Sequence, residues 1–289
     1  MTRVLVLGST GMLGSAVEQV LRESGVEVIT ASRTQGVRFD AEDLGSAALI
    51  TATGLGAGDY IVNCVGLTKA RIDESSRTSR DLAVKLNIEF SSNLAAAAEQ
   101  SGAKVIQVAT DCVFSGTAGN YYETSGHDAL DVYGKTKSLG EVPSENVMHL
   151  RCSLVGLEIG RSSLFFEWVR NQPQGAKISG FTNHIWNGLS SRAFGKVVTG
   201  IIQKDLFSAG MQHLVPTNQV TKDELVRMEL AALGRDDVSV LSVAAGIAVD
   251  RTLKTENNKQ NSELFLAAGY SEIPTIEQMV LEACENLPN

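Results

Sequence analysis

The sequence predicts an α/β protein built on a doubly wound parallel sheet, with a smaller α+β domain toward the C-terminus. Short apolar runs alternate with helical patterns through the N-terminal half, as expected when both faces of a parallel sheet are covered by helices. A glycine-rich turn joins the first apolar run directly to the first helical pattern. After about residue 155 the alternation weakens, which indicates a region of different construction.

Composition excludes several classes of function. The chain has 289 residues, of which 43% are hydrophobic and 20% charged, as in a soluble globular protein. A net charge of −8 argues against nucleic acid as a partner. The apolar runs are too short to span a membrane, and the N-terminus shows no cleavable signal pattern. We therefore expect a cytoplasmic protein.

The histidines and cysteines form no metal-binding pattern. The four cysteines, at positions 64, 112, 152 and 284, are dispersed, as free thiols in a reducing compartment would be. The four histidines are scattered, so no metal site is predicted. Three of the cysteines follow predicted strand ends; either one of them lines a cleft, or all are small core residues, which is the more ordinary interpretation.

The first apolar run, residues 3–8, ends in a glycine-rich turn, and a helical pattern continues to Ser24. In this context Gly-x-x-Gly-x-x-Gly permits a tight turn and a close approach of the backbone to a pyrophosphate, which the helix N-terminus also attracts. The arrangement is typical of the Rossmann dinucleotide site. The residues predicted to bind the dinucleotide here are Gly8, Thr10, Gly11, Met12, Leu13 and Gly14.

The second strand, residues 26–30, leads to Ser32 and Arg33. An arginine at this strand end accommodates a 2′-phosphate, so NADP(H) is favoured and NAD(H) stays open; a solvated surface arginine is the alternative. Asp40 either meets the adenine or caps a helix that begins near residue 41. The next strand, residues 59–65, ends in a small-residue turn, and the residues expected near the cofactor there are Cys64, Val65 and Gly66.

A loop over residues 69–80 and one long helix over residues 80–100, with Asn87 as a buried polar residue, precede the strand 104–109. That strand delivers Thr110 and Asp111 to the sheet edge where ligands bind in such folds. After a loop over residues 116–131, Tyr133 begins a helix and Lys137 follows one turn later on the same face. A cation beside a phenol favours the phenolate, so this pair is suited to exchanging a proton with a substrate oxygen.

The C-terminal part is less regular. We expect strands at 147–151 and 210–215, and helices at 164–171, 190–203 and 271–286 and, with a Thr-x-x-Glu capping box, at 221–232. The segment 181–188, with Trp186, is either a substrate-binding loop or a packed connection, and residues 250–253 are expected to form an exposed, ligand-facing turn. Residues 1–155 would bind the dinucleotide, with 181–210 packing back onto them. Residues 156–180 and 211–289 would form the substrate-binding domain.

Three motifs in this order resemble the extended short-chain dehydrogenases/reductases: the glycine turn, the segment from Ala109 to Phe114, and Tyr133-x-x-x-Lys137. More narrowly, the chain is similar to the dTDP-4-dehydrorhamnose reductase branch, whose strand end commonly reads Ser-Thr-Asp-Tyr-Val-Phe and whose next strand ends Leu-Arg-Thr-Ser. This chain has Cys112 in place of the tyrosine, and Cys152 in place of the second threonine.

The resemblance implies an NADPH-dependent reductase of a 4-keto nucleotide-sugar. Tyr133 would protonate the carbonyl oxygen, Thr110 would hydrogen-bond it, and Lys137 would hold the nicotinamide ribose and lower the Tyr133 pKa. Lower-weight substrate candidates are Asp111, Trp186 and Arg251, with Arg161 as another diphosphate partner.

Two alternative functions stay open, namely a nucleotide-sugar epimerase and a non-catalytic regulatory subunit like that of methionine adenosyltransferase. Cys112 stands where the related 4,6-dehydratases have a glutamate, which disfavours an elimination reaction. The identity of the sugar and the oligomeric state are not readable from the sequence, although homodimers are common in similar proteins.

Overall fold

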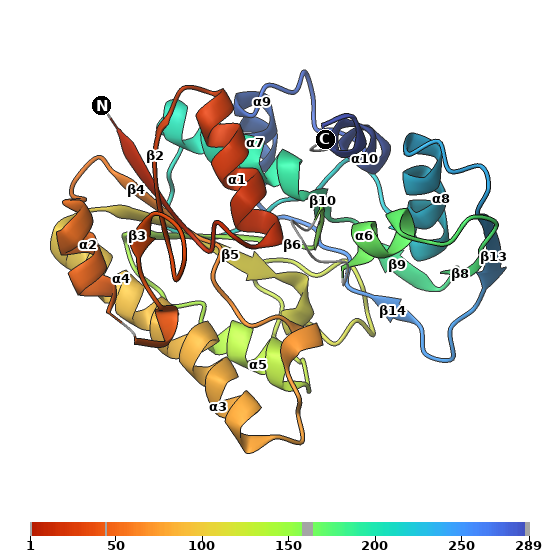
Figure 1. Ribbon diagram of the computed structural model, residues 1–289, viewed down its shortest axis with the longest axis horizontal. Helices are drawn as coiled ribbons and strands as arrows, with labels where there is room; N and C mark the ends of the chain where they lie inside the picture. Colours follow the sequence, from red (N-terminus) through yellow and green to blue (C-terminus); the bar gives the residue numbers. More distant parts are fainter. Residues whose placement is uncertain (1, 44, 158–163, 287–289) are drawn as a thin grey trace.

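The computed structural model describes residues 2–43, 45–157 and 164–286. A parallel sheet crosses the molecule, with helices on both of its faces (Figure 1). Its seven strands are β1 (Arg3–Leu7), β2 (Glu27–Ser32), β3 (Val37–Arg38), β4 (Tyr60–Asn63), β5 (Lys104–Thr110), β6 (Val147–Cys152) and β11 (Gly210–His213). Their order is β11-β6-β5-β4-β1-β2-β3 and every neighbouring pair is parallel, so the predicted doubly wound sheet is confirmed.

The central strand β1 shows why an uninterrupted apolar run predicts a buried strand of a parallel sheet. Val4 and Val6 belong to one hydrophobic core cluster and Leu5 and Leu7 to another. Successive strand residues point to opposite faces, so both faces of β1 must be apolar when both are covered. The chain runs from β1 through β2 to the sheet edge at β3 and then returns to β4 on the other side of β1, and this reversal of direction creates a ligand crevice between the ends of β1 and β4.

Two layers of helices cover the sheet. In Figure 1 one layer, with α1 and α7, lies above the sheet, and the other, with α2, α4 and α5, lies below it. Helix α7 packs directly on α1, where Gly195 allows close contact with Val20. The bounds of these helices are α1 (Met12–Glu23), α2 (Ser46–Thr53), α4 (Phe90–Ser101), α5 (Val132–Leu139) and α7 (Ser191–Gln203).

The segment before α4 departs from the prediction. Residues 69–80 are not wholly a loop, because they contain the 3-10 turn η2 (Lys69–Arg71) and the start of α3 (Arg77–Val84). The expected single helix over 80–100 is interrupted by a π-helical segment, η3 (Lys85–Glu89), before α4 begins. π-Helical turns are uncommon and often mark functional positions, and this one contains Asn87.

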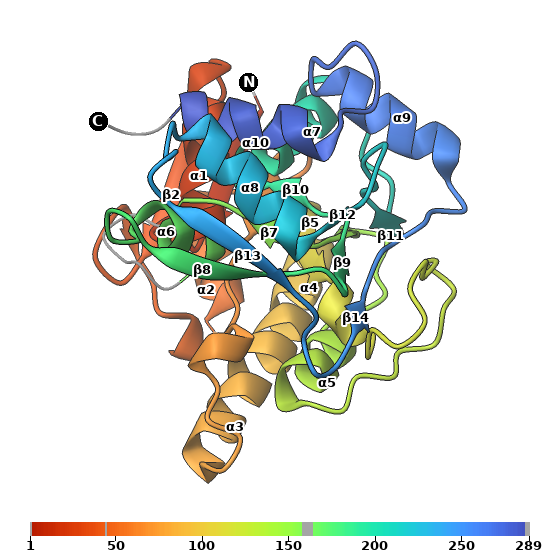
Figure 2. The same ribbon diagram turned by 90° about the vertical axis from the view of Figure 1, so that its right-hand side faces the viewer.

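The described residues of the C-terminal region add four helices and three small sheets. Figure 2 shows the β8–β13 ribbon beside α8. The predicted capping box of α8 is confirmed, with Thr221 and Glu224 bonding reciprocally. The helices are α6 (Phe165–Arg170), α8 (Lys222–Ala232), α9 (Asn258–Ala267) and α10 (Ile276–Glu285), and the short strands are β7 (Leu154–Val155), β8 (Lys177–Phe181), β9 (His184–Trp186), β10 (Leu189–Ser190), β12 (Val220–Thr221), β13 (Ser239–Val243) and β14 (Val249–Asp250).

The turn at residues 250–253 is not exposed as expected. Thr252 and Leu253 are each only 1% exposed. The side chain of Asn187 holds Leu253 through both of its backbone polar groups, with bonds of 2.8 and 2.9 Å. The segment around Trp186 therefore acts at least as a packed connection. Within the described residues, every helix is too short or too polar to cross a membrane.

Candidate active site

The sheet brings Thr110, Tyr133 and Lys137 to the wall of one cavity of about 430 Å³. Thr110 ends β5, whereas the other two residues lie on α5. Asp131 caps that helix by accepting a hydrogen bond from the backbone N–H of Gly134 at 2.8 Å. The cap fixes where the helix begins, and with it the direction in which both side chains leave the helix.

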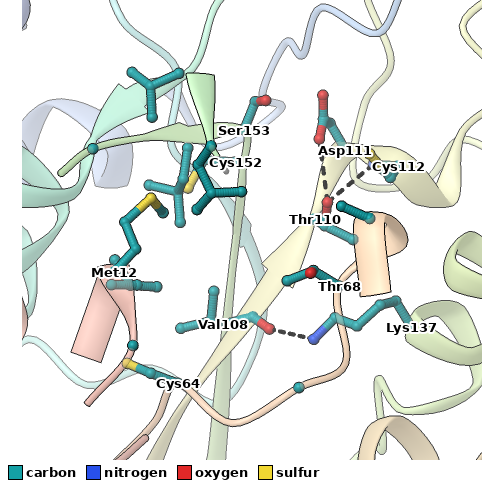
Figure 3. A pocket seen from close by; sticks show the side chains of 18 of the residues that line it. Met12, Cys64, Thr68, Val108, Thr110, Asp111, Cys112, Lys137, Cys152 and Ser153 are labelled. Atoms are coloured by element: carbon teal, nitrogen blue, oxygen red, sulfur yellow. Dashed lines mark hydrogen bonds between the residues drawn. The ribbon is translucent and has the colours of Figure 1, made fainter. Parts of the chain in front are cut away.

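Lys137 reaches from α5 to β5. Its Nζ donates a 2.9 Å hydrogen bond to the carbonyl oxygen of Val108, as Figure 3 shows. Burial lowers the pKa of Lys137, while the carboxyl group of Glu141 and the thiol of Cys64 raise it. The lysine is thus anchored at the cavity wall by a backbone carbonyl.

The expected lowering of the Tyr133 pKa is not what this structure shows. Burial raises the pKa of Tyr133 well above its usual value, and Cys112 adds to the rise, while a hydrogen bond with Thr110 opposes it. The removal of the phenol from water is the largest influence on this pKa. Tyr133 therefore starts as a protonated phenol, the form that a proton donor needs.

Thr110 lies at the centre of a short polar chain at the end of β5. Its Oγ1 donates to Oδ1 of Asp111 at 3.2 Å and accepts the backbone N–H of Cys112 at 3.2 Å (Figure 3). Burial raises the pKa of Asp111, against the opposing charges of Arg251 and Lys222. The 3-10 turn η4 (Asp111–Val113) follows at once and aims these side chains into the cavity region.

Asn87 is buried, as the sequence predicted, and it connects α5 to a neighbouring loop. Its side chain accepts the N–H of Leu67 at 2.8 Å, and donates to the carbonyl of Leu67 at 3.1 Å and to Oγ1 of Thr136 at 3.0 Å. A Cβ at Gly140 would lie 1.9 Å from the Asn87 carbonyl oxygen, so α5 can approach the π-helical segment only with glycine there. This contact fixes α5 relative to the loop after β4.

The glycine turn has the geometry of a dinucleotide cradle. Gly8 has φ +76°, and a Cβ at Gly14 would lie 2.2 Å from the carbonyl oxygen of Gly8. The N-terminus of α1, at Gly11, has no side-chain cap, so its N–H groups are available to a phosphate. The predicted residues of this turn and of the β4 end that line the cavity are Thr10, Gly11, Met12, Leu13, Gly14, Cys64, Val65 and Gly66.

A second cavity lies beside the ends of β2 and β3 and is lined by Arg33, Arg38 and Asp40, among others. Asp40 accepts the N–H of Glu42 at 3.1 Å, so it caps the 3-10 turn η1 (Ala41–Asp43) while it also faces this cavity. The Ser32 hydroxyl is committed to its own turn, where it accepts the N–H of Gln35 at 2.7 Å. Arg38 is a second cation that sequence reasoning missed.

The residues predicted to contact the substrate differ in whether they line the main cavity. Trp186 lines the main cavity although it is only 5% exposed, and its indole N–H donates to Ser153 at 2.8 Å. Arg251 is not among the residues that line the cavity; its guanidinium donates to the carbonyls of Phe114 and Ser115 at 2.8 and 3.1 Å. Arg161 lies outside the described residues. The interpretation of Arg251 as a ligand-facing group is therefore not supported.

Several wall residues were not predicted. Cys112 and Cys152 line the cavity together with Cys64, so the view of these cysteines as plain core residues was too simple. Burial raises the pKa of Cys64 and of Cys112 to about 12, which keeps both thiols protonated and weakly reactive. Lys222, the first residue of α8, also lines the wall. No feature of the sequence indicated that this lysine, at the start of a helix, would face the cavity.

Behind α5 lies a buried charge cluster around Arg151, a residue only 1% exposed. Its guanidinium binds both carboxylate oxygens of Glu141 and contacts Nε2 of His127 and of His213, each at 2.9 Å. It also stacks over the ring of Phe114 at 5.2 Å. Glu141 is one turn beyond Lys137, so the cluster connects the end of α5 to β6 and β11.

Comparisons with known proteins agree with this architecture. A family model described as RmlD substrate binding domain matches residues 1–245. Methionine adenosyltransferase 2 subunit beta of Xenopus tropicalis is 36% identical over 144 residues, 48% of this chain and 41% of that protein. A dTDP-4-dehydrorhamnose reductase of Streptomyces griseus is 34% identical over 140 residues, 48% of this chain and 43% of that protein. This chain thus aligns with less than half the length of either relative.

A solved dTDP-4-dehydrorhamnose reductase of Bacillus anthracis in complex with NADP shares the fold. Its TM-score is 0.80 at 20% identity, over 99% of this chain and all of that one. Among the described residues, no group of three or more histidine, cysteine, aspartate or glutamate side chains could hold a metal ion.

Proposed function

The chain belongs to the RmlD substrate binding domain family, and on this premise we propose that it is an NADPH-dependent reductase of a 4-keto nucleotide-sugar. The observation that carries the proposal is the meeting of Thr110, Tyr133 and Lys137 with the glycine turn around one cavity. A proton donor, an orienting hydroxyl and a phosphate cradle are the parts that carbonyl reduction needs.

When bound, NADPH supplies the hydride that reduces the carbonyl carbon. The chain's own residues act on the carbonyl oxygen. Tyr133 transfers its phenolic proton to that oxygen, and Thr110 donates a hydrogen bond to it by turning its hydroxyl away from Asp111. Lys137, whose ammonium already lies at the wall, stabilises the tyrosinate that remains until solvent returns the proton. The protonated state of Tyr133 suits this direction of proton transfer.

The glycine turn and the second cavity would hold the cofactor. The N-terminus of α1 receives the pyrophosphate, while Arg33 and Arg38 line the cavity suited to a 2′-phosphate. This pair of arginines supports the preference for NADP(H) over NAD(H).

The proposal is tested by mixing the protein with NADPH and a panel of 4-keto nucleotide-sugars while absorbance is followed at the nicotinamide band. We expect one NADPH consumed per sugar reduced, and a loss of rate of about 10²–10⁴-fold in Tyr133→Phe. Turnover without net NADPH consumption would favour the epimerase and contradict the proposal.

A second candidate is a non-catalytic regulatory subunit, favoured by the similarity to methionine adenosyltransferase 2 subunit beta. Fold alone does not separate the two roles. The complete set of Thr110, Tyr133 and Lys137 supports the enzyme. Stable binding to a methionine adenosyltransferase catalytic subunit, unaffected by Tyr133→Phe, would support the regulatory role instead.

A further inference from the structure

Lys222 is a cation in the cavity wall that has no role in the reaction proposed above. It is the first residue of α8, directly after the capping residue Thr221. It lines the same cavity as Thr110 and Tyr133, although 85 or more residues separate it from either in the sequence. The fold has therefore brought a lysine from the C-terminal region to the catalytic residues.

Two aromatic side chains hold the Lys222 ammonium. Its Nζ lies 4.6 Å from the ring centroid of Phe165 and 4.9 Å from that of Trp186, and both rings line the cavity. The hydrogen bond from the Trp186 indole to Ser153 fixes one of these rings. The ammonium is thus held at a defined place by groups that do not neutralise its charge.

In the described part of the chain, no carboxylate lies within ion-pair distance of this lysine. Its nearest titratable neighbours are Asp111, Cys112 and Glu229, which raise its pKa, while burial dominates and lowers the pKa to about 8. A partly desolvated ammonium that faces a cavity gains most from an anion that enters with a ligand.

Helix stability does not account for this residue. A cation in the first turn of a helix faces the positive end of the helix dipole, which is unfavourable. The capping box of α8 is completed by Thr221 and Glu224 without any part of Lys222. The residue is thus placed against local helix preference, as residues at binding sites often are.

The other cations near the cavity are engaged elsewhere or lie more open. Lys137 is bonded to the carbonyl of Val108, and Arg251 is bonded to the carbonyls of Phe114 and Ser115. Arg71 also lines the cavity, but its side chain is exposed. Among the described residues, Lys222 is therefore the desolvated cation best placed to receive substrate charge.

We propose that Lys222 binds an anionic oxygen of the substrate, contributed either by the diphosphate of a nucleotide or by a carboxylate on the sugar. This assignment rests on the proposed function, because it takes the cavity to be the nucleotide-sugar site. It gives Lys222 the recognition role that the sequence suggested for Arg251.

The test is calorimetric titration of the NADP⁺-loaded protein with four probes: dTDP, UDP, UDP-glucose and UDP-glucuronate. Lys222→Met removes the charge and keeps a long apolar stem between the two rings, whereas Lys222→Arg keeps the charge. Lys177→Met is the matched control, because it removes an exposed lysine from β8. Thermal unfolding of each variant is measured in parallel.

If Lys222 contacts the diphosphate, Lys222→Met should lower the affinity of every probe that binds by about tenfold or more, which is the range for losing a charge-assisted hydrogen bond. For a sugar carboxylate, only UDP-glucuronate is weakened. In both cases Lys222→Arg retains most of the affinity, NADP⁺ binding is unchanged, and the melting temperature of Lys222→Met is equal or higher because an unfavourable helix charge has gone.

The pH dependence provides a further readout. Probe affinity in the unsubstituted protein should fall above about pH 8 as the ammonium loses its proton, and this fall should be absent from Lys222→Met and Lys222→Arg. Asp111, Cys112 and Glu229 are unchanged in these variants, so a fall that persists in them would originate elsewhere and contradict the assignment.

Equal probe affinities in Lys222→Met, Lys177→Met and the unsubstituted protein would overturn the inference while the proposed function stands. A Lys222→Met variant that loses probe affinity, NADP⁺ affinity and thermal stability together would show a structural role, and would also overturn it. If the unsubstituted protein bound none of the four probes, the proposed function itself would fail, and this assignment with it.

Discussion

Replacing Arg151 by methionine is expected to lower the free energy of unfolding by about 3–5 kcal/mol, the range for breaking a buried ion pair from one side. The guanidinium is 1% exposed and binds both oxygens of Glu141, besides two histidine nitrogens at 2.9 Å each. Methionine keeps an apolar side chain against Phe114 but leaves the Glu141 carboxylate buried without a cation.

The pH dependence of this loss is also predictable. Burial already raises the pKa of Glu141, and Arg151 is the main opposing influence. Without Arg151 the pKa rises further, so the carboxyl group takes up a proton in the folded state. Stability is then lost as pH rises from the unfolded pKa through the new folded pKa, and the penalty of Arg151→Met should be larger at about pH 8 than at about pH 5.

The assay is urea unfolding followed by circular dichroism at both pH values. Arg22→Met is the matched control, because Arg22 forms an exposed ion pair with Glu18 on α1 and should cost less than about 1 kcal/mol. The double variant Arg151→Met/Glu141→Leu should recover part of the loss, since it removes the uncompensated charge. A loss no larger than that of Arg22→Met, or one that does not change with pH, would refute this reasoning.

Three further predictions follow from buried or clustered charges. Burial and Arg151 lower the pKa of His213 to about 4, so the neutral imidazole is favoured in the folded state. Stability should therefore be lost as the pH falls from about 6.5 to about 4, and the melting temperature of His213→Gln should fall less over this range. Glu229 is fully buried, neither of its carboxyl oxygens has a hydrogen-bond partner among the described residues, and burial raises its pKa to about 9. Glu229→Met should therefore raise the urea midpoint, more at about pH 8 than at about pH 6, and a lower midpoint would contradict this. Arg33→Ala and Arg38→Ala should each weaken NADPH binding by about tenfold while leaving NADH binding nearly unchanged, as measured by fluorescence titration. Equal losses for both cofactors would refute the role of these arginines in binding the 2′-phosphate.

The part of the fold that followed from the sequence was the part set by local pattern. The largely apolar runs of β1, β4 and β5 are buried on both faces, so their composition identifies them. The helix α8 was marked by its capping box. The helix expected to begin near residue 41 is split into the 3-10 turn η1 at Ala41–Asp43 and α2, which starts at Ser46. The short strands β9, β12 and β14 were missed, because strands of two or three residues depend on tertiary pairing for their existence.

The candidate site likewise has features that the sequence predicted and features that it could not predict. The spacing of Tyr133 and Lys137 on one helix, and the place of Thr110 at a strand end, could be read from the sequence because each rests on a local regularity. The pKa of Tyr133 could not, since burial depends on the packing of distant segments. The place of Lys222 in the cavity wall, and the bond of Arg251 to the Phe114 carbonyl, could not be read from the sequence for the same reason, because both depend on the packing of the C-terminal region.

The measurement that tests the central claim most directly is transfer of deuterium to a 4-keto nucleotide-sugar from NADPH that carries deuterium at both C4 positions, followed by mass spectrometry and NMR of the sugar product. The reductase mechanism predicts one deuterium at C4 of the sugar for each NADPH oxidised, with Tyr133→Phe slowing the transfer by about 10²–10⁴-fold. Sugar turnover without deuterium at C4, or a Tyr133→Phe variant as fast as the unsubstituted protein, would contradict the account.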